Sequence, residues 1–193
     1  MGDYFQTFVD LDAGPEDAQQ YADRAVRWLV AKGIVLAERT DCVIGPPLGH
    51  PPGPKWAEAV DCHSSQEAPY DGLAVCVGRE IFDSGQGDPE AVTCPRCAAS
   101  TSLVDDDWEL DLGLWRPFRQ AMDTWESTGT GEAPCPACAH PVPITEFTYE
   151  GCEFAYGCLG LTFWNWPEFT GEFEEDLSEA LDGHRVECIE GKL

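Results

Sequence analysis

Two short cysteine motifs carry the clearest chemistry in this chain of 193 residues. Each is a Cys-Pro-x-Cys pair, and their cysteines are Cys94, Cys97, Cys135 and Cys138. A tight Cys-x-x-Cys turn presents two sulfur atoms on one side, so two such turns can complete a tetrahedron of thiolates around one metal ion. The spacing therefore predicts one structural Zn²⁺ per chain. A closed four-thiolate site has no open coordination position, so we expect no catalysis by this metal.

Residues 91–143 resemble the zinc-ribbon, or rubredoxin-knuckle, proteins, because all four cysteines match the knuckle pattern one by one. Two features depart from that pattern. Ala98 and Ala139 stand where a glycine usually follows the second cysteine, and the spacer 98–134 is longer than is common between such pairs. The whole chain also resembles a group of uncharacterised acidic actinobacterial zinc-ribbon proteins, which share a Cys-Pro-x-Cys pair and a closing strand like residues 161–167. That resemblance implies no activity.

A redox-active dithiol is the competing hypothesis for these pairs, because Cys-Pro-x-Cys also resembles glutaredoxin active sites. There the first cysteine lies at a helix N-terminus, which lowers its pKa. Pro141 and Pro143 oppose a helix after the second pair, and no amphipathic pattern follows the first. We favour zinc, with the dithiol as the alternative. The remaining cysteines are expected to be small buried hydrophobes: Cys42, Cys62, Cys76, Cys152, Cys158 and Cys188.

The charge of the chain limits its partners. Its 36 acidic and 11 basic side chains give a formal net charge of −25. The chain carries −9 up to Cys97 and −16 beyond it, so no basic segment is hidden by the average. This charge opposes binding to nucleic acid and to anionic membrane surfaces and favours a basic protein partner, although solubility alone could explain it. No apolar run is long enough to span a membrane.

The N-terminus lacks the basic and apolar regions of a secretory signal, so we expect a cytoplasmic protein. An exported chain whose signal has been removed is the alternative. In the reducing cytoplasm, ten cysteines indicate metal binding more than disulfides.

Hydrophobic periodicity places regular elements at both ends of the chain. Residues 4–11 alternate as a strand, a helix follows up to Gly33, and residues 34–37 read as a short buried strand. Strand, helix and strand recur between residues 159 and 190. Two such units predict an α+β fold with a mixed sheet built from N- and C-terminal βαβ units, of split βαβ type. We expect one domain, 1–193, with its core in 1–90 and 144–193 and a zinc-ribbon insertion in 91–143.

The middle of the chain contains less regular material. Residues 45–54 are rich in proline and glycine and predict a stiff loop. Residues 73–77 and 80–82 predict one strand interrupted at Gly78, or two short strands. A helix is expected to start near Pro117, with one apolar face formed by Phe118, Ala121, Met122 and Trp125.

An acidic stretch alternates with apolar residues from Asp107 to Leu112. This pattern predicts a half-buried strand with acids on its outer face and Trp108, Leu110 and Leu112 on its inner face. A solvated edge, a docking surface for a basic partner and a cation site are the three interpretations. The candidate docking residues are Asp105, Asp107, Glu109 and Asp111.

Residues 163–169 form an aromatic run, in which Trp164 and Trp166 are expected to share one strand face, opposite Phe163 and Asn165. Core packing is one interpretation, and an exposed binding ridge formed by Trp164 and Trp166 is the other.

These features predict a non-enzymatic, zinc-stabilised acidic binding protein, of inhibitor or immunity type, that engages a basic protein partner. We assign no catalytic residue. The alternative is a small enzyme or small-molecule binder whose pocket lies near the proline-rich loop and uses His50, Cys62, His63 and the aromatic run. A nucleic-acid adaptor is a third class, which the net charge opposes.

Overall fold

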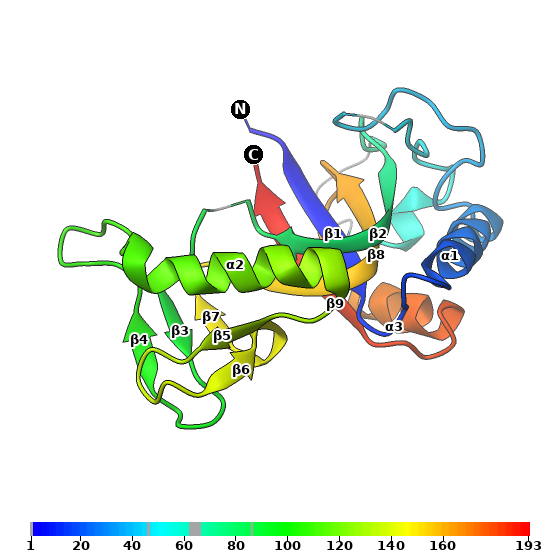
Figure 1. Ribbon diagram of the computed structural model, residues 1–193. Helices are drawn as coiled ribbons and strands as arrows, with labels where there is room; N and C mark the ends of the chain where they lie inside the picture. The colour runs from blue at the N-terminus through cyan, green and yellow to red at the C-terminus, as the bar shows by residue number, and fades with distance from the viewer. Residues whose placement is uncertain (1, 46, 62–66, 86) are drawn as a thin grey trace.

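The computed structural model describes residues 2–45, 47–61, 67–85 and 87–193. Figure 1 shows two lobes, joined by a long ribbon of strands. We call them the sheet lobe and the metal lobe. The sheet lobe consists of β1 (Tyr4–Asp10), α1 (Ala18–Lys32), η1 (Trp56–Glu58), β2 (Leu73–Asp83), β8 (Phe154–Trp164), α3 (Gly171–Ala180) and β9 (Val186–Lys192). The metal lobe consists of β3 (Ala91–Thr93), β4 (Ser100–Ser102), α2 (Leu112–Thr128), β5 (Glu132–Pro134), β6 (Pro141–Pro143), η2 (Ile144–Glu146) and β7 (Thr148–Glu150).

The α+β class is confirmed, but the mixed sheet of βαβ units is wrong. The four-stranded sheet has the order β2-β8-β1-β9, and each neighbouring pair is antiparallel. Residues 34–37 form no strand, because Ile34 closes the end of α1 by a hydrogen bond to Leu29 and Val35 makes only an isolated bridge to Pro52. β8 and β9 run in the same direction, but β1 lies between them, so the C-terminal unit has no adjacent parallel strands.

α1 and α3 cover one face of this sheet. The helix predicted before Gly33 is confirmed, and Gly33 ends it at φ 78°, a conformation that glycine adopts without strain. The apolar stripe of α1 packs with Phe173 and Leu177 of α3 against Phe8 and Phe163 of the sheet. The sheet lobe therefore has a hydrophobic core of its own.

β2 is one strand with an irregularity where the sequence indicated an interruption. Its pairing with β8 shifts register between Val77 and Glu80, and Gly78 lies there at φ 135°. Beyond this bulge β2 and β8 continue toward the metal lobe, where Ile81, Phe154 and Tyr156 pack against its core. The β2–β8 ribbon thus links the two lobes.

α2 begins at Leu112, five residues before Pro117, because the Asp111 side chain caps it. The Asp111 carboxylate accepts hydrogen bonds from the N–H groups of Gly113 and Leu114 at 2.8 and 3.1 Å. The predicted apolar face of α2 is confirmed, since its four residues are buried in the metal lobe. Within the described residues, no helix is both long and apolar enough to cross a membrane.

Candidate metal centre

The two cysteine pairs lie in two matching turns. The first turn joins β3 to β4 and the second joins β5 to β6. In each, the residue after the second cysteine donates its N–H to the first cysteine's carbonyl oxygen, from Ala98 to Cys94 at 2.9 Å and from Ala139 to Cys135 at 2.8 Å. The chain therefore folds into the same knuckle twice.

Ala98 and Ala139 adopt the left-handed conformation that this turn requires. Their φ angles are 57° and 58°. Glycine would adopt these angles freely, whereas an alanine costs about 1 kcal/mol there because of its Cβ atom. The missing glycines therefore leave the knuckle geometry intact at a modest energetic cost.

The four sulfur atoms lie close enough together to surround one metal ion. All four are within 4.8 Å of one another, and the Sγ atoms of Cys97 and Cys135 are 3.8 Å apart. Zinc–thiolate bonds of about 2.3 Å arranged as a tetrahedron place neighbouring sulfurs about 3.8 Å apart. Cys94, Cys97, Cys135 and Cys138 are thus positioned to hold one metal ion.

The environment of the second knuckle favours a thiolate. Desolvation acts to raise the pKa of Cys135, but hydrogen bonds from the N–H groups of Cys138 and Ala137 and from neighbouring thiols lower it to about 7. Cys94 and Cys135 are buried and belong to the metal-lobe core, whereas Cys97 is exposed. The site therefore lies at the lobe surface but is anchored in its interior.

The structural context differs from that of a glutaredoxin-type dithiol. Strands β4 and β6 follow the two cysteine pairs, so neither pair begins a helix whose N-terminus would activate a thiolate. The described cysteines form no disulfide. Outside the metal site, Cys152 and Cys158 are buried as expected, Cys42, Cys76 and Cys188 are half-buried, and Cys62 lies outside the described residues.

The segment that we call the acidic loop, residues 105–111, connects β4 to α2 and projects from one end of that helix (Figure 1). The strand predicted here is wrong. Asp105 folds the segment into a turn instead, since its carboxylate accepts hydrogen bonds from the N–H groups of Asp107 and Glu109 at 2.9 and 3.0 Å. A bridge between Val104 and Leu110 closes the turn.

Trp108 lies in the acidic loop with 72% of its surface exposed and φ at 64°. Sequence patterning assigned it to a buried face, so its exposure was missed. The four candidate docking acids, Asp105, Asp107, Glu109 and Asp111, are also exposed. The predicted strand with acids on its outer face is therefore absent, and an exposed tryptophan surrounded by exposed acidic residues lies in its place.

Trp164 and Trp166 do not share a face, because Asn165 between them has φ 55° and ends the strand. Trp166 is 6% exposed and packs among Trp56, Phe163 and Phe169 in the sheet-lobe core. Trp164 is half-buried on the opposite side, against Phe5. The two residues therefore form no joint aromatic ridge.

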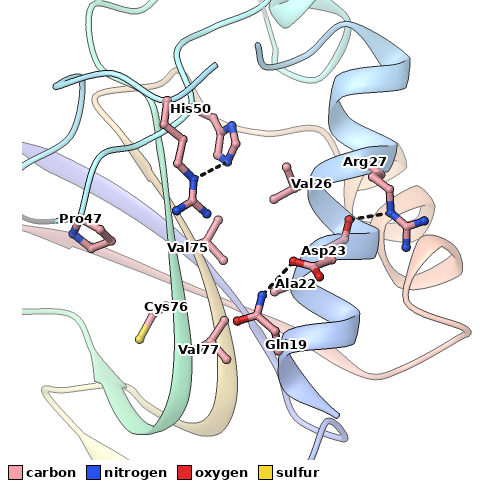
Figure 2. A pocket seen from close by; sticks show the side chains of 11 residues that line it. Gln19, Ala22, Asp23, Val26, Arg27, Pro47, His50, Val75, Cys76 and Val77 are labelled. Carbon is pink, nitrogen blue, oxygen red and sulfur yellow. Dashed lines mark hydrogen bonds between the residues drawn. The ribbon is translucent and has the colours of Figure 1, made fainter. Parts of the chain in front are cut away.

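A groove of about 680 Å³ lies between α1 and the outer edge of β2, beside the proline-rich loop (Figure 2). His50, 4% exposed, lines it, and its ring contacts the Leu36 carbonyl oxygen at 2.9 Å and accepts a hydrogen bond from Arg39 Nε at 3.3 Å. Of the other residues named for the alternative function, Cys62 and His63 lie outside the described residues. No motif or spacing in the sequence indicates Arg39 as a site residue.

Comparisons with protein-family models, curated proteins and solved structures found no match to this chain. The resemblance to zinc ribbons therefore rests on the four cysteines and on the geometry of their two turns.

Proposed function

We propose that this protein is a zinc-stabilised, non-enzymatic binding protein that docks on a basic protein partner through the acidic loop. The observation that carries the proposal is the exposure of Trp108 within that loop. Exposed tryptophans surrounded by polar residues are typical of protein-binding sites, where the ring becomes the buried anchor and the polar groups form the rim.

The chemistry of the donor set supports zinc as the metal. Four thiolates in a tetrahedral arrangement are the ligands of structural zinc, and the 3.8 Å between the Sγ atoms of Cys97 and Cys135 fits its bond length. A reducing cytoplasm would keep these thiols available for metal. With all four positions occupied by protein, the metal supplies folding energy and no reaction site.

The metal lobe supports the acidic loop at both ends. On one side, Leu103 donates its N–H to the backbone carbonyl oxygen of Glu90 at 2.7 Å. This hydrogen bond connects the loop to the sheet of β3, β4 and β7. On the other side, Asp111 donates its N–H to the backbone carbonyl oxygen of Leu103 at 2.7 Å. Asp111 also caps α2, and α2 packs in the core that contains Cys94 and Cys135. Zinc in the knuckles would therefore hold the loop in a fixed shape.

The charge of the chain supports a cationic protein as the partner. The loop carboxylates belong to a chain with a net charge of −25, so its field attracts cationic proteins and accelerates their encounter. An inhibitor or immunity-type role, which requires rapid capture of a cationic target, fits this charge. Trp166 is omitted from the proposed surface because it is buried, and Trp164 lies in the other lobe.

The test is an affinity pull-down from cells of the source organism with three forms of the protein at low and high salt. Trp108→Ala removes the proposed anchor, and Tyr70→Ala is the matched control, because Tyr70 is 94% exposed and lies outside the loop. We expect a basic protein that the wild type and Tyr70→Ala capture and Trp108→Ala does not, with capture weakened by salt. Equal capture by all three forms would contradict the proposal.

The groove beside His50 is the second candidate site, and its side chains favour binding over catalysis. Both ring nitrogens of His50 are engaged, one by the Leu36 carbonyl and one by Arg39, so the ring is placed to orient Arg39. Nucleophilic catalysis would need a histidine nitrogen directed at a thiol or hydroxyl.

A further inference from the structure

The groove between α1 and β2 combines a cationic side chain with an unpaired strand edge. We propose that it binds the C-terminal end of an extended peptide, which pairs antiparallel with β2 and places its terminal carboxylate on Arg39. The proposal gives the second candidate site its ligand and does not depend on the acidic loop.

The edge of β2 offers backbone hydrogen-bonding groups to the groove. β2 is an edge strand of the four-stranded sheet. At this edge, Leu73 uses both its N–H and its C=O to pair with His50, and each hydrogen bond is 2.9 Å long. Alternate residues of a strand direct these groups to the same edge. Those of Val75 and Val77 therefore face the groove, and in the described chain no hydrogen bond to them is present.

The pairing that His50 begins stops after one bridge. Gly49 turns away and instead exchanges two hydrogen bonds with Thr40, at 2.9 and 3.0 Å. Residues before His50 would lie opposite Val75 and Val77 if this antiparallel pairing continued. A bound peptide can take their place, because adding a strand to a free edge is a general mode of peptide recognition.

The direction of such a peptide brings its C-terminus to Arg39. A chain antiparallel to β2 runs from the Val77 end toward the Leu73 end, where His50 is paired and holds Arg39 by its ring. A guanidinium binds a carboxylate through two parallel hydrogen bonds. Among the described residues no carboxylate forms an ion pair with Arg39, although the chain contains 36 acidic side chains.

The walls of the groove suit a peptide side chain and an N-terminal extension. Val26 of α1 and Val75 of β2 provide apolar contacts on facing elements (Figure 2). Asp23 lies further along α1, where Gln19 donates a hydrogen bond to its carboxylate at 2.8 Å. Asp23 and a second arginine of the lining, Arg27, both come from α1, where Arg27 Nε donates to the Asp23 carbonyl oxygen at 3.0 Å. Arg39 is held by His50 beside β2, so it is the cation at the end of the edge where the peptide would terminate.

The test uses a library of random hexapeptides with free C-termini and the same library with C-terminal amides. We expect the free acids to be enriched on the protein and the best of them to bind about tenfold more weakly as amides. Arg39→Gln should cause a similar loss. Arg119→Gln is the matched control, because Arg119 is an exposed arginine on α2, outside the groove, and it should leave binding unchanged.

Two further measurements report on strand pairing itself. The amide resonances of Val75 and Val77 should shift and exchange more slowly when peptide binds. N-methylation of peptide residues in one alternating register should abolish binding, whereas methylation in the other register should not. Failure to enrich free acids over amides, binding insensitive to Arg39→Gln, or binding indifferent to N-methylation register would each overturn the proposal. None of these results bears on Trp108.

Discussion

Removal of the metal should unfold the metal lobe and leave the sheet lobe folded. The two lobes bury separate hydrophobic clusters, one around Phe118 and Trp125 of α2 and one around Phe8 and Phe163 of the sheet. Only the first cluster contains cysteines of the candidate metal centre, Cys94 and Cys135. The energetic consequence of metal loss should therefore be local.

The loss of stability on metal removal can be estimated from the size of the metal lobe. The metal lobe extends from β3 at Ala91 to β7 at Glu150, and its strands have three residues each. A core of such a small unit rarely supplies more than about 3–5 kcal/mol. Structural zinc contributes about 10–16 kcal/mol at neutral pH. With zinc in the site, as we propose, the lobe without metal should have little stability of its own, and its fold should depend on the ion.

A single ligand substitution gives a graded version of the same perturbation. Shared among four thiolates, the zinc energy amounts to about 3 kcal/mol each, so Cys138→Ser should weaken zinc binding about 100-fold. Cys138 is half-buried, so the change of sulfur to oxygen creates no cavity in the core. Cys42→Ser is the matched control, because Cys42 is also half-buried and lies in the sheet lobe.

Hydrogen exchange measured by mass spectrometry locates the unfolding. On addition of a strong chelator, peptides from α2 and the acidic loop should lose protection, whereas peptides from β1 and α1 should keep it. Substitution with Co²⁺ should give the thiolate charge-transfer bands of a four-sulfur site in the wild type. Unchanged protection of α2 after metal removal would refute the structural role of the metal. Loss of protection throughout both lobes would refute the independence of the two cores.

Four further predictions concern single residues. Asp10→Ala should lower the free energy of unfolding, measured by urea denaturation, by about 3 kcal/mol. The reason is that the buried Asp10 carboxylate accepts hydrogen bonds from the N–H groups of Asp12 and Ala13 and contacts His184. Asp111→Ala should cost about 1 kcal/mol by uncapping α2 and should increase amide exchange at its first turn. Ala139→Gly should raise the stability of the metal-loaded protein by about 1 kcal/mol, since glycine relieves the strain at φ 58°, and a lower melting temperature would contradict this. Burial raises the pKa of Cys188 to about 12, so the folded state keeps the thiol proton as the pH rises above the unfolded thiol pKa of 9.0. The free energy of unfolding should therefore fall between these two pH values, by about 1 kcal/mol at pH 10.5 once the partial exposure of Cys188 is allowed for. Cys188→Ala should reduce that fall.

The parts of the fold that sequence predicted correctly are governed by local rules. The αL cap at Gly33, the break of β2 at Gly78 and the buried face of α2 each follow from the conformational preference or periodicity of neighbouring residues. The cysteine pairs belong to the same class, because each knuckle is a local turn. That both turns meet at one point could be expected only from the demand of a metal for four ligands.

The errors arise where two local preferences compete or where distant segments decide the outcome. Residues 107–112 alternate like a strand, but Asp105 and Asp111 compete by hydrogen-bonding backbone N–H groups, which produces a turn and a helix cap. Residues 34–37 are apolar like a buried strand, yet β8 takes the position next to β1 that they would have needed. Neither result can be derived from hydrophobic alternation alone.

The same competition explains why Trp108 and Arg39, the central residues of the two candidate binding sites, could not be predicted from the sequence. Trp108 is exposed because the turn made by Asp105 removes it from the face to which alternation assigned it. Arg39 faces the groove because the loop that carries it returns to β2 through His50, a contact between segments that no spacing rule connects. In each case a polar side chain fixes the backbone and a different residue becomes accessible. His50→Ala should therefore weaken peptide binding in the groove without removing any proposed contact to the peptide. Asp105→Ala should weaken docking through the loop for two reasons, because it releases the turn and also removes one carboxylate of the acidic rim.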